Sequence, residues 1–174
     1  MIGESKKMSE KDKVFSNKVK FRGVFSFPDF YQFAYDWLKD ETGLLLSEDK
    51  YKEKISGDVK NLEIEWTGRR DITDYFRFEM KVVFRIIGLA NVEVVQDGKK
   101  IKTNKGEIEM KIEGNLIRDY KSKFEKSAIH KFMRAIYEKS VISARVEQFE
   151  VKIIEDCNEL LSQVKAYLDL EGKR

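Results

Sequence analysis

Residues 75–87 alternate between two classes of side chain. One parity is wholly apolar and comprises Phe76, Phe78, Met80, Val82, Phe84 and Ile86. The other parity includes charged residues of both signs at Arg77, Glu79, Lys81 and Arg85. Successive side chains of a strand point to opposite faces, so this pattern predicts a long strand with one buried face and one face in water. The rest of the chain must therefore supply a cover for the apolar face.

The same alternation predicts further strands on both sides of this one. We expect them at residues 19–27, 50–55, 61–67, 92–95, 99–103 and 107–116. The Asp97-Gly98 pair between two of these runs is a strong hairpin signal. Short turns between successive strands indicate antiparallel pairing. We also expect cross-strand ion pairs between the strand that carries lysines at 50, 52 and 54 and the strand that carries glutamates at 63 and 65.

Two helical regions complete the pattern. Phe30 to Asp40 reads as a helix that follows Pro28 and closes at Gly43. Near the C-terminus, Ile129, Phe132, Met133 and Ile136 form one apolar stripe, and a second stripe runs from Ile142 to Leu168. These stripes lie roughly 110° apart around a helix axis and can face one core only if the helix breaks. We place the break between Lys139 and Ser143, followed by a helix from Val141 to Leu170 of about 45 Å.

These elements predict an α+β fold. A curved antiparallel sheet of about seven strands, in the order β-α-β6-α, packs on the long C-terminal helix. The 174 residues suffice for one domain. We assign residues 17–174 to this domain and residues 1–16, with Lys6, Lys7, Lys11 and Lys13, to a flexible basic tail.

Charge and cysteine content exclude several classes of protein. The 34 Lys and Arg residues are nearly balanced by 31 Asp and Glu, which argues against a nucleic-acid-binding protein because such a protein concentrates a basic excess on one face. The longest uncharged run, Ile86 to Val92, is far too short for a transmembrane segment. Cys157 is the only cysteine, so no intrachain disulfide can form, and we expect a cytoplasmic protein.

No pattern of catalytic or metal-ligating residues is present. His130 is the only histidine and is interpreted as a surface or helix-end residue, since a zinc site needs further His or Cys ligands. Glu107, Glu109 and Glu113 share the polar face of one strand and are interpreted as a solvated charge ladder. We therefore predict no catalytic residue, no metal and no cofactor, and the sequence favours a protein that is not an enzyme.

The order of elements resembles that of the helix-grip superfamily. The expected order is a strand, a helix, six antiparallel strands and a long final helix, with a short helix at Ser127 to Ile142 before the last one. Over Val19 to Leu170 this order is similar to that of START-like lipid-transfer and polyketide cyclase-like proteins. The resemblance implies a curved sheet that grips the final helix, often around an apolar cavity. Two departures stand out: the final helix is longer than such a sheet requires, and bulky rings occupy the inward positions.

Two functions remain open. The first is non-covalent binding of a small hydrophobic or lipid-like molecule between the sheet and the C-terminal helix. Its candidate ligand-binding residues are Phe33, Trp37, Glu53, Trp66, Phe76, Phe78, Met80, Phe84, Met110, Val146, Phe149 and Ile153. Glu53 shares a strand face with Tyr51 and Ile55, so it either orients a ligand or lies at an exposed strand end.

The alternative is a cavity-free interaction or oligomerisation module. If the C-terminal helix projects beyond the sheet, its distal apolar residues need another partner. These residues are Leu160, Leu161, Val164, Tyr167 and Leu168. A homodimer through this helix is the simplest arrangement that would cover them.

Overall fold

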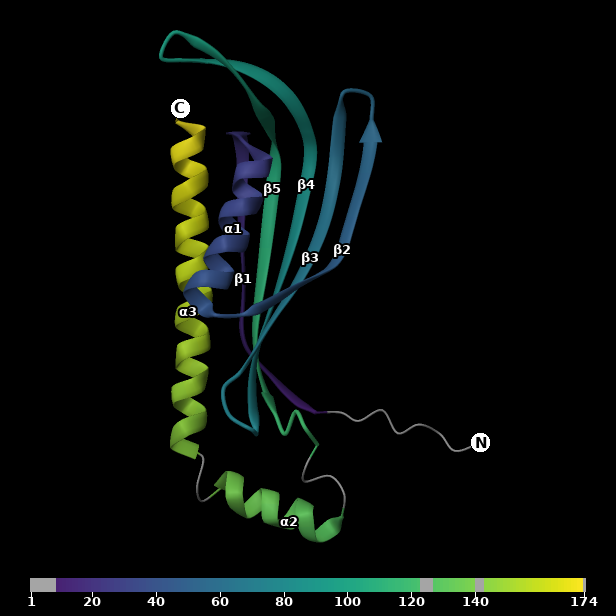
Figure 1. The fold of residues 1–174 in the computed structure, drawn as a ribbon, viewed down its shortest axis with the longest axis vertical. Helices are drawn as coiled ribbons and strands as arrows, with labels where there is room; N and C mark the ends of the chain where they lie inside the picture. The colour runs from purple at the N-terminus through teal and green to yellow at the C-terminus, as the bar shows by residue number, and fades with distance from the viewer. Residues whose placement is uncertain (1–8, 123–126, 140–142, 174) are drawn as a thin grey trace, which may run out of the picture.

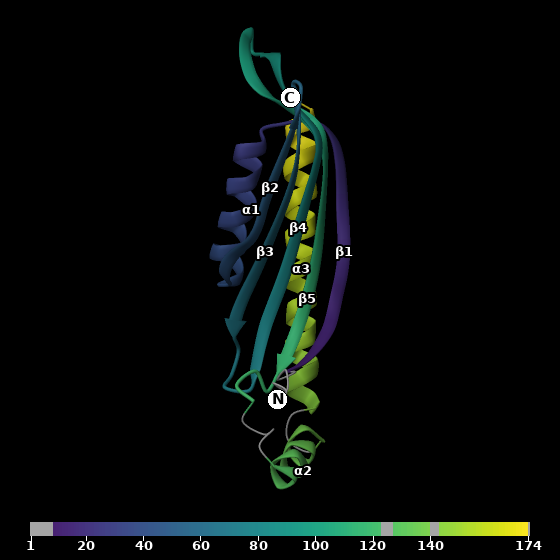
Figure 2. The same ribbon diagram turned by 90° about the vertical axis from the view of Figure 1, so that its right-hand side faces the viewer.

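A computed structural model describes residues 9–122, 127–139 and 143–173. The elements, in chain order, are β1 Glu10–Phe25, α1 Phe27–Thr42, β2 Leu45–Ser56, β3 Val59–Asp71, β4 Phe76–Gln96, β5 Lys99–Arg118, α2 Ala128–Tyr137 and α3 Ser143–Gly172. The strands form one antiparallel sheet in the order β1-β5-β4-β3-β2. Helices α1 and α3 lie on the same face of this sheet, whereas α2 lies crosswise at one end of the molecule (Figures 1 and 2). The predicted α+β class is confirmed.

The sheet of the described chain has five strands, so the prediction of about seven is wrong. The predicted strands at 92–95 and 99–103 are the distal parts of β4 and β5, which pair continuously from Ala90↔Lys105 to Gln96↔Lys99. A bulge between Ile87 and Ala90, with Gly88 at a φ of 63°, interrupts the alternation without ending either strand. The long β4–β5 hairpin extends beyond the helices at the end opposite α2 (Figure 1).

The first strand begins earlier than the sequence predicts. Residues 10–16, assigned above to the tail, belong to β1 and pair with β5 from Glu10↔Arg118 onward. Arg118 also forms an ion pair with Asp12, with Nε and Oδ2 2.8 Å apart. A register shift between Lys13 and Phe15 breaks the alternation in this part of the strand, which explains why periodicity alone did not reveal it. The first eight residues of the tail lie outside the described residues.

Helix α1 confirms the predicted helix and its end signals. The Ser26 hydroxyl accepts a hydrogen bond from the Asp29 amide, Pro28 lies in the first turn, and Gly43 adopts a φ of 65° at the C-terminus. The buried face of α1 comprises Phe27, Phe30, Ala34, Leu38 and Thr42. This face packs on the apolar side of the sheet and positions α1 beside α3.

Helix α3 covers the sheet with its C-terminal part. Leu160, Leu161, Val164 and Leu168 are all buried, so the expected distal overhang is wrong. The other end of the helix, residues 143–152, contains no buried residue, although Val146 and Phe149 pack against the border of the core. Gly114 of β5 sets the contact between α3 and the sheet, because a Cβ atom there would lie 2.7 Å from Cγ2 of Ile153 and 2.8 Å from Sγ of Cys157. The missing side chain lets α3 approach the sheet closely.

None of the described helices lies on the opposite face of the sheet, which is covered with charges of alternating sign. One row crosses all five strands through paired positions Lys20, Glu109, Arg85, Glu63 and Lys52. Nζ of Lys20 lies 3.0 Å from Oε2 of Glu109, and this hydrogen bond lowers the pKa of the Glu109 carboxyl. The predicted cross-strand pairing of β2 with β3 is also present, with Lys50 2.9 Å from Glu63. These carboxylates are therefore neutralised by neighbouring strands.

Candidate functional site

Most of the predicted ligand-binding residues form the hydrophobic core. Seven of the twelve have an exposed fraction of at most 2%: Trp66, Phe76, Phe78, Met80, Phe84, Met110 and Ile153. The ring centroids of Trp66 and Phe84 are 4.7 Å apart in an edge-to-face arrangement, and Phe30 contacts Phe84 in the same manner at 6.0 Å. These rings fill the space between the sheet and α1 by direct contact with one another.

Four more of the predicted residues lie at the border of this core. Phe33 of α1 stacks on Tyr167 of α3, with centroids 4.5 Å apart and an interplanar angle of 13°. Phe149 contacts Phe76 edge-on at 5.4 Å, whereas Trp37 and Val146 are half-buried against the core. The structure therefore brings eleven of the twelve residues to one apolar cluster or its border.

Glu53 does not join this cluster. It is exposed near the end of β2, and its carboxylate lies 3.3 Å from Nζ of Lys60 on the adjacent strand. The acidic group beside the aromatic residues is Glu48, which accepts hydrogen bonds from Tyr31 and, at 3.2 Å, from Nε1 of Trp66. Burial and the Glu48 carboxylate together raise the pKa of Tyr31 to about 12.

Sequence periodicity missed Glu48 for a specific reason. A bulge between Glu48 and Lys50 shifts the register of β2 by one residue. Even-numbered Glu48, before the bulge, therefore points to the same face of the sheet as odd-numbered Glu53, after it. The alternation after the bulge correctly groups Glu53 with Tyr51, but it assigns Glu48 to the other face. No local signal in the sequence marks this bulge.

Four surface hollows formed by described residues all lie away from these positions. One of these four, with a volume of about 730 Å³, is on the charged face of the sheet and is lined by residues such as Lys18, Lys81, Glu65 and Glu113. The other three adjoin the strand ends and the β4–β5 hairpin. None of the twelve predicted residues lines any of these four hollows. Ligand binding within the apolar cluster stays a prediction.

A different candidate site lies at the end of the sheet, where α2 is attached. Ser127 caps this helix by accepting a hydrogen bond from the His130 amide at 3.2 Å. The His130 side chain is exposed near the helix start, as the sequence indicates. The predicted helix break includes residues 140–142, which lie outside the described residues; α2 ends at Tyr137 and α3 begins at Ser143.

Arg134 attaches one side of α2 to the sheet. Its Nε donates hydrogen bonds to Glu138, at 2.9 Å, and to the Tyr75 hydroxyl, at 3.0 Å, while Nη2 lies 2.6 Å from Oε2 of Glu10. Tyr75 also donates a hydrogen bond to Glu138. Burial and the Glu138 carboxylate raise the pKa of Tyr75. For Glu138, burial alone would raise the pKa, but the hydrogen bonds from Tyr75 and Arg134 outweigh it and lower the pKa.

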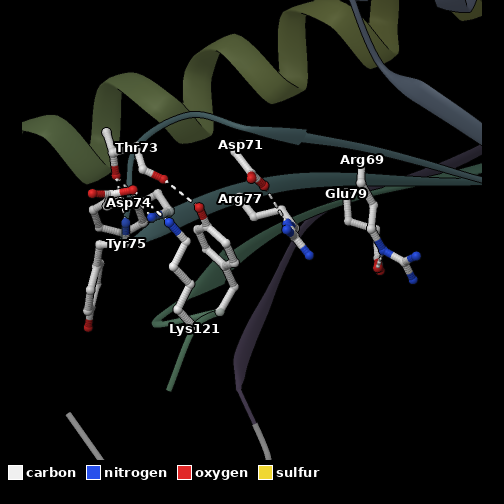
Figure 3. A network of polar contacts seen from close by, with 10 residues as sticks. Arg69, Asp71, Thr73, Asp74, Tyr75, Arg77, Glu79 and Lys121 are labelled. Atoms are coloured by element: carbon white, nitrogen blue, oxygen red, sulfur yellow. Dashed lines mark hydrogen bonds and ion pairs between the residues drawn. The ribbon is translucent and has the colours of Figure 1, made fainter. Parts of the chain in front are cut away.

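A second polar network stiffens the region to which α2 is attached. Asp71 and Arg77 form an ion pair across the β3–β4 turn with 2.6 Å between Oδ1 and Nε, and this contact lowers the pKa of Asp71. The Arg77 guanidinium lies 4.2 Å from the ring centroid of Tyr120, just after β5. Lys121 reaches Asp74 at 2.7 Å (Figure 3). Together these contacts tie the β3–β4 turn, which contains Tyr75, to the chain that leads toward α2.

The other side of α2 is apolar and exposed. The exposed fractions are 71% for Ile129, 67% for Phe132, 54% for Met133 and 49% for Ile136. At about 100° per residue, these four side chains are centred roughly 180° around the helix from Arg134 and Glu138. The apolar side of α2 therefore points away from the sheet, and α2 buries no residue.

The apolar stripe of α2 is predictable from the sequence, but the residues that surround it in the folded protein are not. The predicted break does separate two helices, yet only the stripe on α3 faces the core. The attachment through Glu10 and Tyr75 was missed because it joins residues far apart in the chain. The spacing of Arg134 and Glu138 by four residues is the one local signal that was readable.

No model of a known protein family, no curated protein and no solved structure matches this chain. Within the described ranges, no helix is both long and apolar enough to cross a membrane. The described residues also contain no group of three or more His, Cys, Asp or Glu side chains placed to hold a metal ion. The geometry of the end that carries α2 is thus the main guide to function.

Proposed function

We propose that this protein is an interaction module that presents the apolar side of α2 to a partner. This is the alternative function considered from the sequence, with α2 in place of the distal part of α3 as the contact element. The observation that carries the proposal is the exposure of Ile129, Phe132, Met133 and Ile136 on a helix whose opposite side is fixed by Arg134. A contiguous exposed apolar patch of this kind is typical of an interaction site.

The way α2 is held supports this proposal. An isolated helix of ten residues is marginal in water, and most helices in proteins are stabilised by burying an apolar face. Here polar contacts to Tyr75 and Glu10 replace that burial and leave the apolar side free for a partner. The sheet and α3, with their common core, act as the rigid support.

Binding of a small hydrophobic molecule, as the helix-grip resemblance implies, is the second hypothesis. A ligand beneath the helices would require rings such as Phe78 and Phe84 to move, because they are at most 2% exposed. We therefore rank it below the interaction module. We also place the module in the cytoplasm, a reducing compartment suited to the single buried Cys157. A homodimer, if formed, would use α2 and not the buried distal part of α3.

Site-specific photo-crosslinking tests the proposed function. A benzophenone amino acid at Phe132, which is exposed, should give discrete covalent adducts in living cells, because benzophenone inserts into C–H bonds of proteins and lipids alike. Leu45 is 82% exposed at the start of β2 and provides the matched control position. Mass spectrometry then identifies each adduct as a second copy, another protein or a lipid. Identical adduct patterns from the two positions would refute the proposal.

A further inference from the structure

We propose that the partner of α2 is the surface of a lipid bilayer that carries anionic headgroups, on which the helix lies flat. This inference rests on the proposed function and names its partner. It follows from three observations: the local charge around α2, the side of the helix that remains open, and the arrangement of its side chains. A flat-lying amphipathic helix inserts its apolar side at the boundary of headgroups and acyl chains.

The first observation is a charge excess that is confined to this region. Between residues 121 and 145 the sequence has seven Lys and Arg against two Glu, whereas the remaining chain has 27 Lys and Arg against 29 Asp and Glu. Of the described residues in this region, Lys131, Lys139 and Arg145 are exposed. Lys121 is also exposed but pairs with Asp74. Basic residues near a membrane are attracted by anionic lipids, and each contributes to binding over a range set by the salt concentration.

The second observation is the direction in which α2 is open. Its polar side already contacts Glu10 and Tyr75, so only the side that points away from the sheet is accessible. The helix also lies crosswise at the end of the molecule, and α3 extends away from it along the long axis (Figures 1 and 2). A planar surface can therefore reach the apolar side of α2 without contacting the sheet or the other described helices.

The third observation is the order of side chains around the helix. Ile129, Phe132, Met133 and Ile136 form the centre of the exposed side. At about 100° per residue, Lys139 lies at one edge of this apolar sector. Tyr137 lies at the other edge, where its ring contacts Tyr75 edge-on with centroids 6.0 Å apart. A long lysine side chain such as that of Lys139 can extend to the headgroups while its methylene stem stays in the apolar layer. The pattern matches that of interfacial helices.

Two other occupants fit these observations less well. A hydrophobic protein groove would accept the apolar side of α2, but it would leave the exposed Lys139 and Arg145 without an opposite charge. A second copy of this chain in a symmetric dimer would place one basic α2 region against another, and like charges in contact disfavour association. An anionic surface satisfies both the apolar side and the charge.

Vesicle binding by the full-length protein tests this inference. The probes are large unilamellar vesicles of phosphatidylcholine alone and of phosphatidylcholine with phosphatidylglycerol at about two to one. Wild-type protein should sediment with the anionic vesicles and not with the neutral ones, and added salt should weaken binding. Phe132→Ser should weaken binding about tenfold through lost apolar contact. Lys139→Glu, at the edge of the apolar sector, should weaken it about tenfold through reversed charge.

Matched variants keep this test interpretable. Leu45→Ser removes an apolar side chain that is even more exposed than Phe132, and Lys54→Glu reverses an exposed charge on β2. Both variants should bind anionic vesicles like wild type. A polarity-sensitive dye on Ile129→Cys should also increase in fluorescence with anionic vesicles, since Cys157 is buried and does not compete for labelling. Equal melting temperatures confirm that each variant is folded.

Each remaining outcome has a definite meaning. Two results overturn the membrane inference. One is the absence of wild-type vesicle binding, and the other is wild-type binding that is equal for both vesicle types and equal to that of Lys139→Glu. If photo-crosslinking at Phe132 nevertheless yields protein adducts that are absent at Leu45, the interaction module stands with a different partner. If position 132 gives no distinct adduct and Phe132→Ser binds vesicles like wild type, both the inference and the proposed function fail.

Discussion

Arg134 of α2 and Glu10, the first residue of β1, form an ion pair with 2.6 Å between Nη2 and Oε2. The same guanidinium donates to Glu138 and Tyr75, and its side chain is only 13% exposed. One residue thus connects the short helix to both the start of the sheet and the β3–β4 turn. The orientation of the apolar side of α2 depends on this connection, because α2 buries no residue of its own.

Arg134→Ala should release α2 without unfolding the sheet. The loss of charge-assisted hydrogen bonds should lower the local stability of α2 by about 1–3 kcal/mol. Hydrogen–deuterium exchange should therefore be faster at the amides of Ala128–Tyr137 and unchanged in β4 and β5. Lys131→Ala, an exposed site on the same helix, is the control and should exchange like wild type. Equal protection of α2 in Arg134→Ala and wild type would show that Arg134 does not hold the helix.

Glu79 should make stability depend on pH in the acid range. Its carboxylate is buried between Lys11, at 2.5 Å, and Arg69, at 3.0 Å; Figure 3 shows Arg69 beside it. Burial opposes ionisation, but these contacts prevail and hold the pKa of Glu79 below its ordinary value of 4.5. The stabilisation is therefore complete above about pH 4.5 and is lost as the pH falls through the lower folded-state pKa.

Glu79→Gln removes this pH-dependent contribution. The variant should be about 1–2 kcal/mol less stable than wild type in urea at neutral pH, and the difference should shrink below the ordinary carboxyl pKa. The exposed carboxyl of Glu147 serves as the control, and Glu147→Gln should leave the curve unchanged. A difference between wild type and Glu79→Gln that stays constant from neutral pH to strong acid would contradict this assignment.

Gly114→Ala should push α3 away from the sheet. A methyl group at this position would contact Ile153 and Cys157 at less than 3 Å, and overpacking of this kind costs about 1–3 kcal/mol. Cys157→Ala removes one of the two obstructing atoms, so the double variant should be more stable than the sum of the single effects predicts, by about 1 kcal/mol. Chemical unfolding of the four proteins measures this coupling. Ser162→Ala, at an exposed position of α3, is the control, and its effect should simply add to that of Gly114→Ala. If the effects of Gly114→Ala and Cys157→Ala are also additive, the close contact is contradicted.

Cys157 should be unreactive in the native protein. Burial and the neighbouring Asp156 carboxylate raise the pKa of its thiol to about 12, so almost no thiolate forms at neutral pH. A chromogenic disulfide reagent should react only after addition of denaturant. Ile129→Cys places a second thiol on the exposed side of α2 and should react at once, with one equivalent per chain. Rapid reaction of wild-type protein would show that α3 opens readily from the sheet.

Local sequence patterns determined much of the architecture. The alternation at 75–87 predicts the apolar face of β4, Pro28 and Gly43 mark α1, and the stripe on α3 predicts a long covering helix. These features succeed because side-chain direction and capping depend on residues close together in the chain. The number of strands, the start of β1 and the place of Glu48 depended on bulges, which shift side-chain parity without a sequence signal.

The surroundings of each apolar stripe were decided by tertiary structure alone. The stripe of α2 and the stripe of α3 look equally suited to a core, yet the first faces away from the protein and the second is buried. The difference arises from long-range contacts: Arg134 meets Glu10 and Tyr75, while Gly114 admits Ile153 and Cys157. Periodicity shows that a helix has an apolar side. Only the packing of distant segments determines whether the protein covers that side itself or leaves it for a partner.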